Sequence, residues 1–171
     1  EQTFDGLRAQ WGSTKLKIDL SYAAQVNRVF GPDSPQGKWE GEFLLANAAY
    51  TLPIGTFTLF DYYLDVDETA AVSTNTVGAK LAGSRPLGTH TCSYAVAFAQ
   101  QAEAGDNIAD IDLDYYLLEG GLGFKKVAVA LGYELLGGDG TVGFATPLAT
   151  LHAFQGWADK FLATPAAGIE D

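Results

Sequence analysis

Large apolar residues alternate with small or charged ones along much of the chain, most regularly from Ile108 to Leu135. The alternation has period two over two stretches, which predicts two β-strands, and Gly120-Gly121-Leu122-Gly123 between them predicts a tight reversal. Each strand is about ten residues long, more than the usual five or six of a soluble sheet. A strand of that length suits a tilted crossing of a lipid bilayer.

The same alternation predicts six earlier strands, so the chain would hold about eight in all. Short, glycine-bearing turns join the first to the second, the third to the fourth, the fifth to the sixth and the seventh to the eighth, whereas longer polar segments make the other connections. Alternating short and long connections are typical of an up-and-down outer-membrane barrel, although a meander of hairpins can show some parity by chance. The six strands are expected at 3–10, 15–26, 42–51, 56–65, 73–83 and 89–99.

The fold class predicted for residues 1–136 is therefore all-β, an antiparallel up-and-down transmembrane β-barrel of about eight strands or part of a larger one. Bulky side chains are expected to face outward into hydrocarbon and small or charged ones inward, while the fourth strand, aromatic on both faces, is not assigned an orientation. The residues expected outward are Leu16, Ile18, Val127, Val129, Leu131 and Tyr133. The small inward residues are Gly78, Ala95, Ala97, Ala128, Ala130 and Gly132. The residues expected to face the lumen and a solute are Lys15, Lys17, Asp19, Lys80, Asp112, Asp114 and Glu134.

Residues 137–171 depart from the alternation and form a second region. A glycine-rich turn opens it, and Thr146-Pro147 resembles a helix start. Apolar residues then recur at helical spacing, which predicts a short helix from Leu148 to Leu162. This long loop or short helix would fold into or over the barrel, or lie on the surface as an ordered loop.

Charge and composition narrow the function classes. The chain has 171 residues, with 10 Lys and Arg against 21 Asp and Glu, a net charge of −11. This balance argues against a nucleic-acid partner, which requires a basic face. No run approaches eighteen apolar residues, so the sequence predicts no transmembrane helix.

Candidate chemistry is sparse. His90 and Cys92 would share one face of a strand, but structural zinc needs four ligands and nothing nearby in the sequence completes the set. The acidic residues near Asp65 and Asp106 lack the glycine-bearing order of a calcium loop. No nucleophile elbow, phosphate loop or pair of catalytic carboxylates is present. The sequence thus predicts no enzyme, no cofactor and no metal site.

Three segments carry a resemblance to a known family: VNRVFGPDSPQGKWEGEFLLANAAY (Val26–Tyr50), KLAGSRPLG (Lys80–Gly88) and GYELLGGDGTVGFATPLATLHAFQGWADKFLATPAAGIED (Gly132–Asp171). They resemble the alginate-export family of porin-like outer-membrane proteins of Gram-negative bacteria, whose members are larger barrels, so this chain would match an internal to C-terminal portion. The resemblance implies a bacterial outer-membrane location and a diffusion pore for an anionic polysaccharide or another small solute. Such a pore needs basic residues, for which the candidates are Arg8, Lys15, Lys17, Lys80 and Arg85.

Two functions of different classes remain open from the sequence. The first is a porin-like barrel that passes or holds a small solute or oligosaccharide, with the lipid bilayer as partner and with a homo-oligomer or further strands completing the ring. The alternative is a soluble lipocalin-like β-barrel that binds a small ligand, in which the bulky residues would point inward. A third hypothesis, a structural subunit of a membrane assembly, has the same sequence features as the first.

Overall fold

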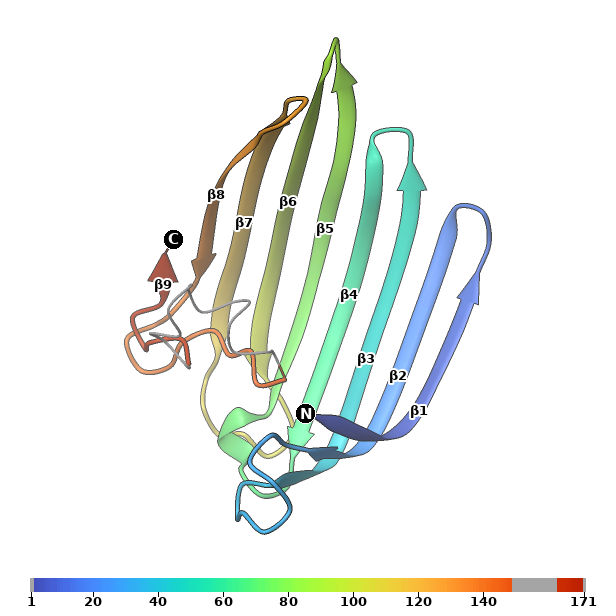
Figure 1. Cartoon of the computed structure of the whole chain (residues 1–171). Coiled ribbons are helices and arrows are strands. Elements are labelled where there is room, and N and C mark those ends of the chain that lie inside the picture. The colour runs from blue at the N-terminus through green and yellow to red at the C-terminus, as the bar shows by residue number, and fades with distance from the viewer. Residues whose placement is uncertain (1, 149–162, 171) are drawn as a thin grey trace.

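A single antiparallel sheet forms the body of the molecule in the computed structural model, which describes residues 2–148 and 163–170. Neighbours in sequence are neighbours in the sheet throughout, so the topology is a simple meander (Figure 1). The described residues contain no α-helix, only one 3₁₀ turn, η1 (Ala70–Val72). The strands are β1 (Thr3–Gly12), β2 (Leu16–Asn27), β3 (Lys38–Leu52), β4 (Gly55–Val66), β5 (Thr74–Leu87), β6 (His90–Glu103), β7 (Asp112–Gly123), β8 (Ala128–Leu136) and β9 (Ile169–Glu170).

The all-β class and the eight predicted strands are confirmed, but several strands are longer than predicted. The segment 84–87 and the run 120–123 were both expected to be turns, and both lie within strands; the reversals come at 88–89 and 124–127. Backbone pairing explains the second error, because Gly120 pairs with Tyr94 on one side and with Leu131 on the other. Glycine weakens a strand without ending it where both neighbours pair with it.

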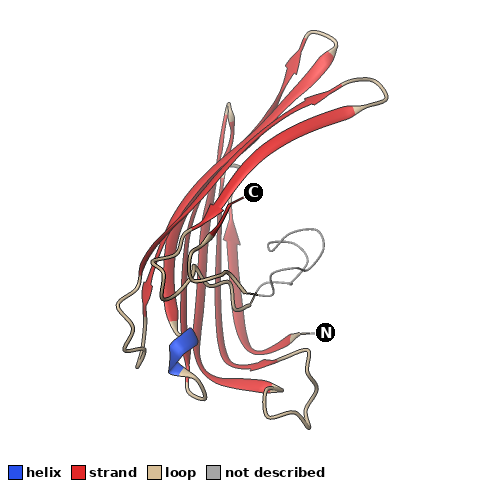
Figure 2. Ribbon diagram, turned by 90° about the vertical axis from the view of Figure 1, so that its left-hand side faces the viewer, coloured by secondary structure: helices blue, strands red, loops and turns tan. Residues whose placement is uncertain are grey.

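A barrel closed by this chain alone is wrong for the described residues, because the sheet is open, and the alternative that the chain is part of a larger barrel stays a prediction. No described strand pairs with the outer edge of β1, and β8 pairs beyond β7 only through Leu135 and Leu136 with the short β9. Figure 2 shows the result, a curved sheet with a convex side and a concave side. Right-handed strand twist curves an antiparallel sheet, but closure also needs the two edge strands to meet.

The connections are sorted by length between the two ends of the sheet. The short turns 13–15, 53–54, 88–89 and 124–127 lie at one end, and the longer segments 28–37, 67–73 and 104–111 lie at the other (Figure 1). Below, these are the short-turn end and the long-loop end.

The core lies on the concave side near the long-loop end. One cluster is formed by the first strands around Val26, Trp39 and Phe43, which are 0%, 7% and 1% exposed. A second cluster joins Leu113 of β7 to Phe144, which comes from the segment after β8. The described part of that segment, 137–148, therefore packs onto the concave face (Figure 2).

Two further points concern helices. The helix predicted from Leu148 to Leu162 falls almost wholly on 149–162, outside the described residues. Among the residues that are described, none belongs to a helix long and apolar enough to cross a membrane.

Candidate functional site

The convex face carries an exposed apolar belt across all eight long strands. One register row reads Leu16, Tyr50, Phe57, Leu81, Val96, Leu118 and Tyr133 from β2 to β8. The adjacent row reads Trp11, Ile18, Ala48, Leu59, Ala79, Phe98, Tyr116 and Leu135 from β1 to β8. Most of these large side chains are exposed, as are Leu7 (80%) and Leu131 (81%). Contiguous apolar patches of this extent mark a surface that meets lipid or protein.

The facing predicted for the six named bulky residues is therefore confirmed, since they lie on the convex face. Val127, Val129 and Tyr133 are 60%, 54% and 41% exposed, and Leu16 and Ile18 lie in the same apolar rows. The small residues predicted to face the other way do so: Gly78 packs against Phe60 and Ala99 on the concave side. The unassigned strand β4 presents Phe57, Leu59, Asp61 and Tyr63 on the convex face, and Phe60, Tyr62 and Leu64 on the concave face.

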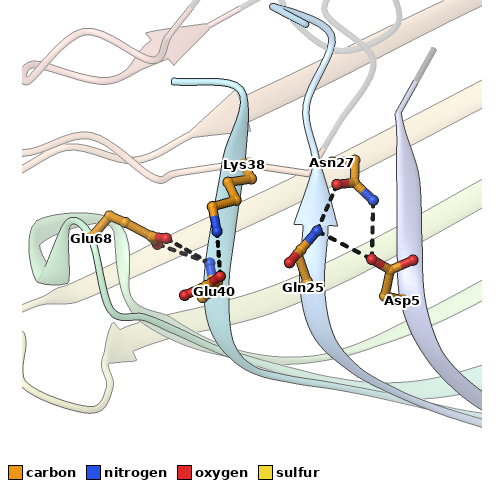
Figure 3. Close-up of polar contacts among 6 residues, drawn as sticks. All are labelled: Asp5, Gln25, Asn27, Lys38, Glu40 and Glu68. Atoms are coloured by element: carbon orange, nitrogen blue, oxygen red, sulfur yellow. Dashed lines mark hydrogen bonds and ion pairs between the residues drawn. The ribbon is translucent and has the colours of Figure 1, made fainter. Parts of the chain in front are cut away.

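Polar side chains border the belt at the long-loop end. Asp5 accepts hydrogen bonds from Gln25 and Asn27, at 3.2 and 3.3 Å, and the Glu68 carboxylate accepts from the backbone N–H of Glu40 (Figure 3). Lys38 also forms an ion pair with Glu40. Farther along the sheet the border continues as Asp61, Asn75, Gln100, Asp112 and Asp114.

The concave face brings together most of the predicted solute-facing residues. Lys17, Lys80 and Glu134 lie on one register row that runs from β2 to β8. Asp19 is on the same face, where the Arg8 guanidinium donates to it from Nε at 2.9 Å and the Gln10 amide donates at 2.7 Å. The Glu134 carboxylate accepts a 2.6 Å hydrogen bond from the Tyr115 hydroxyl. Contact of any of these residues with a solute remains a prediction.

Asp112 and Asp114 do not share that face, so their grouping with the four residues above is wrong. Gln100, which is exposed on the convex face, donates to Asp112 at 2.8 Å, and Tyr116 donates to Asp114 at 3.2 Å. The concave positions of β7 near the long-loop end are instead taken by apolar residues, which the segment 137–148, below called the covering segment, buries; Leu113 is 4% exposed. The alternation of β7 was predicted correctly and its facing was reversed.

Two other basic candidates lie apart from the concave row. Lys15 belongs to the β1–β2 turn at the short-turn end. Arg85 is on the convex side, where it donates to the Pro53 carbonyl of the neighbouring turn. The cations that face the concave side within the strands are thus Arg8, Lys17 and Lys80 among the described residues.

A trough of about 720 Å³ lies on the concave face toward the long-loop end. Its floor is the sheet, including Phe43, Phe60 and Leu64, and part of its wall is the segment 144–148. Two aromatic pairs flank it, Phe60 with Tyr62 and Phe144 with Tyr115, at centroid separations of 5.1 and 5.7 Å. Ligand sites in proteins are concave, mostly apolar and of this size.

Gln101 fixes the covering segment onto the sheet. Its side chain is 1% exposed, donates to the Ala145 carbonyl at 2.9 Å and accepts from the Ala145 N–H at 2.7 Å. It also donates to the Thr76 hydroxyl at 2.8 Å. A buried amide with all these partners holds the backbone of the segment in one place.

Two loop groups have shifted pKa values. The backbone N–H groups of Val142 and Thr141 donate to Asp139 and hold the pKa of that carboxyl below its usual range. Partial burial lowers the pKa of Arg28, whose guanidinium lies 3.8 Å from the ring centroid of Trp39. The hydrogen bonds that Asp139 accepts from Thr141 and Val142 close the turn near the start of the covering segment.

The described residues hold no cluster of three or more His, Cys, Asp or Glu side chains suited to a metal. His90 and Cys92 do fall on one face of β6, but the His90 ring packs against Phe124, with a centroid separation of 4.7 Å. His152 lies outside the described residues.

Sequence reasoning identified neither the trough nor the Gln101 hydrogen bonds that hold the covering segment. Gln101, Phe144 and Phe43 are central to them, yet each sits in an unremarkable local pattern. The local signal for the trough was in β4, where aromatic residues alternate onto both faces and so place large side chains on the concave side as well.

Comparison of the chain with known protein families, with curated proteins and with solved structures finds no match. The resemblance to the alginate-export family therefore stays a prediction.

Proposed function

We propose that this chain forms the wall of a porin-like outer-membrane β-barrel that passes or holds a small solute. The observation that carries the proposal is the convex belt, because two adjacent register rows remain apolar or aromatic from one side of the sheet to the other. An outward apolar band with aromatic residues near its margins and a polar interior is the pattern of an outer-membrane barrel.

Strand length and loop sorting support the same proposal. β2 to β7 contain 12 to 15 residues each. A tilted strand needs about 9–11 residues to cross a bilayer. Short turns at one end and long loops at the other are likewise the arrangement of such barrels.

Membrane insertion requires partners for the edges of the sheet. Unpaired backbone groups cost several kcal/mol each in hydrocarbon, so the edges of β1 and β8 need further strands there. If β1 paired with β8, the chain would form an eight-stranded barrel, and side chains nearly fill the interior of a barrel of that size. The covering segment and the 720 Å³ trough already occupy that side, which favours a wider ring built with strands from a second copy or from other polypeptide.

The lipocalin-like alternative has less support. It requires Val129 and Leu131 to point into the ligand cavity, whereas both lie on the convex face and are exposed. A structural subunit of a membrane assembly would share the belt, and the trough is the feature that favours a solute-handling role over it.

Flotation tests the membrane proposal. The denatured chain is diluted from urea into phosphatidylcholine vesicles, washed with carbonate and centrifuged through a density gradient. We expect it to float with the vesicles after the wash, with its strands protected from protease. A chain that stays in the dense fractions and is monodisperse in detergent-free buffer would contradict the proposal.

A further inference from the structure

The trough differs chemically from the rest of the concave face. Toward the short-turn end this face carries small residues together with Lys17 and Lys80, and is suited to water. In the trough the sheet instead contributes Phe43, Phe60 and Leu64. The covering segment adds further apolar surface through Phe144, Pro147 and Leu148.

The described charged groups along the trough leave no free positive charge. Arg8 and Asp19 form a salt bridge, and the Tyr115 hydroxyl donates to Glu134. An anionic ligand would lose its hydration here, gain no free counter-charge from these residues and be repelled by the Glu134 carboxylate.

A few polar atoms remain to orient a ligand. The Asn47–Tyr62 hydrogen bond, 2.8 Å long, lies on the trough floor. Thr74 also belongs to the lining, although its hydroxyl oxygen is itself buried and is not open to the trough.

We propose that the trough binds an uncharged, mainly apolar small molecule with an aromatic ring and a single polar group. The inference rests on the proposed function, since it names the class of solute that the barrel would take. The volume of 720 Å³ accommodates such a molecule, and the two flanking aromatic pairs offer ring edges and faces for stacking. A charged uronate oligosaccharide does not fit this lining.

Binding of 1-naphthol to the full chain in detergent micelles, measured by equilibrium dialysis against empty micelles, tests the proposal. Two variants change the trough: Phe60→Ala removes a ring from its floor, and Ser21→Trp fills it from β2. Two matched variants make the same changes on the convex face, Phe57→Ala and Leu20→Trp. Far-UV circular dichroism checks that each variant keeps its sheet.

We expect saturable binding that Phe60→Ala weakens about 3- to 10-fold, the value of one aromatic contact. Ser21→Trp should abolish it. Phe57→Ala and Leu20→Trp should leave the Kd within about twofold, as surface changes do.

Equal binding by all four variants would overturn the inference, because the probe would then be held by micelle or convex surface. Binding of a mannuronate hexamer in place of 1-naphthol would overturn it as well. The membrane proposal is tested separately by flotation, so a chain that binds 1-naphthol but fails to float would refute that proposal alone.

Discussion

Replacing Leu131 by arginine tests whether the convex face contacts lipid or water. Leu131 lies on the convex face of β8 and is 81% exposed. Full burial of a leucine side chain is worth about 1.5–3 kcal/mol. Only about a fifth of Leu131 is buried, so losing that contact would cost only about 0.3–0.6 kcal/mol in water. In a bilayer, an arginine facing the hydrocarbon midplane costs about 2–4 kcal/mol.

The assay is equilibrium urea unfolding of the chain in phosphatidylcholine vesicles, followed by tryptophan fluorescence. Ala130→Arg is the matched control, since Ala130 is the preceding residue and is exposed on the concave face. We expect the free energy of unfolding to fall by about 2–4 kcal/mol for Leu131→Arg and by about 1 kcal/mol or less for the control. Equal, small losses for both variants would refute the assignment of the convex face to lipid.

Three further predictions concern the covering segment and the strand packing. Gln101→Leu should lower the free energy of unfolding by about 2–4 kcal/mol, because it leaves the Ala145 N–H and carbonyl without their partner. Hydrogen exchange at the Ala145 amide should also become faster. An unchanged exchange rate would contradict the role of Gln101 in holding the covering segment. Gly83→Ala should destabilise by about 1–3 kcal/mol in urea titrations, since its Cβ would lie 2.4 Å from the Ile54 carbonyl, whereas Gly120→Ala meets no atom within 4 Å and should cost well under that. The pKa of Asp139 is lower in the folded protein than its ordinary value of about 3.9. Its ionised form therefore adds fully to the free energy of unfolding above about pH 3.9, and this stabilisation is lost as the pH falls through the lower pKa of the folded state. The amide proton shifts of Thr141 and Val142 should therefore titrate with a midpoint below about 3.9, and not at all in Asp139→Asn.

Period-two alternation was sufficient to predict the strands because it is a local property. In the first part of β8 each residue shows its face through its size, so Val129 and Leu131 could be placed outward and Ala130 inward from the sequence alone. The sorting of short and long connections was equally visible, since it depends only on the spacing of the strands.

What the sequence could not show depends on segments distant along the chain. Leu113 and Tyr115 are large and alternate with aspartates, which suggested that they face lipid. They are covered instead by Phe144, about thirty residues later in the chain, so they face the concave side. The trough has the same origin, because β4 and the covering segment build it together. Closure of the ring depends on pairing at the edges of β1 and β8, which alternation does not encode.

The most direct test of the convex face as the lipid-facing surface is a spin-label scan of residues 129–133 in vesicles, in a Cys92→Ser background. Collision rates with oxygen, which concentrates in hydrocarbon, and with a water-soluble nickel chelate are measured at each position. We predict that labels at Val129, Leu131 and Tyr133 collide mainly with oxygen, and that labels at Ala130 and Gly132 collide mainly with the chelate. A chelate that reaches Leu131 as readily as Ala130 would contradict the account.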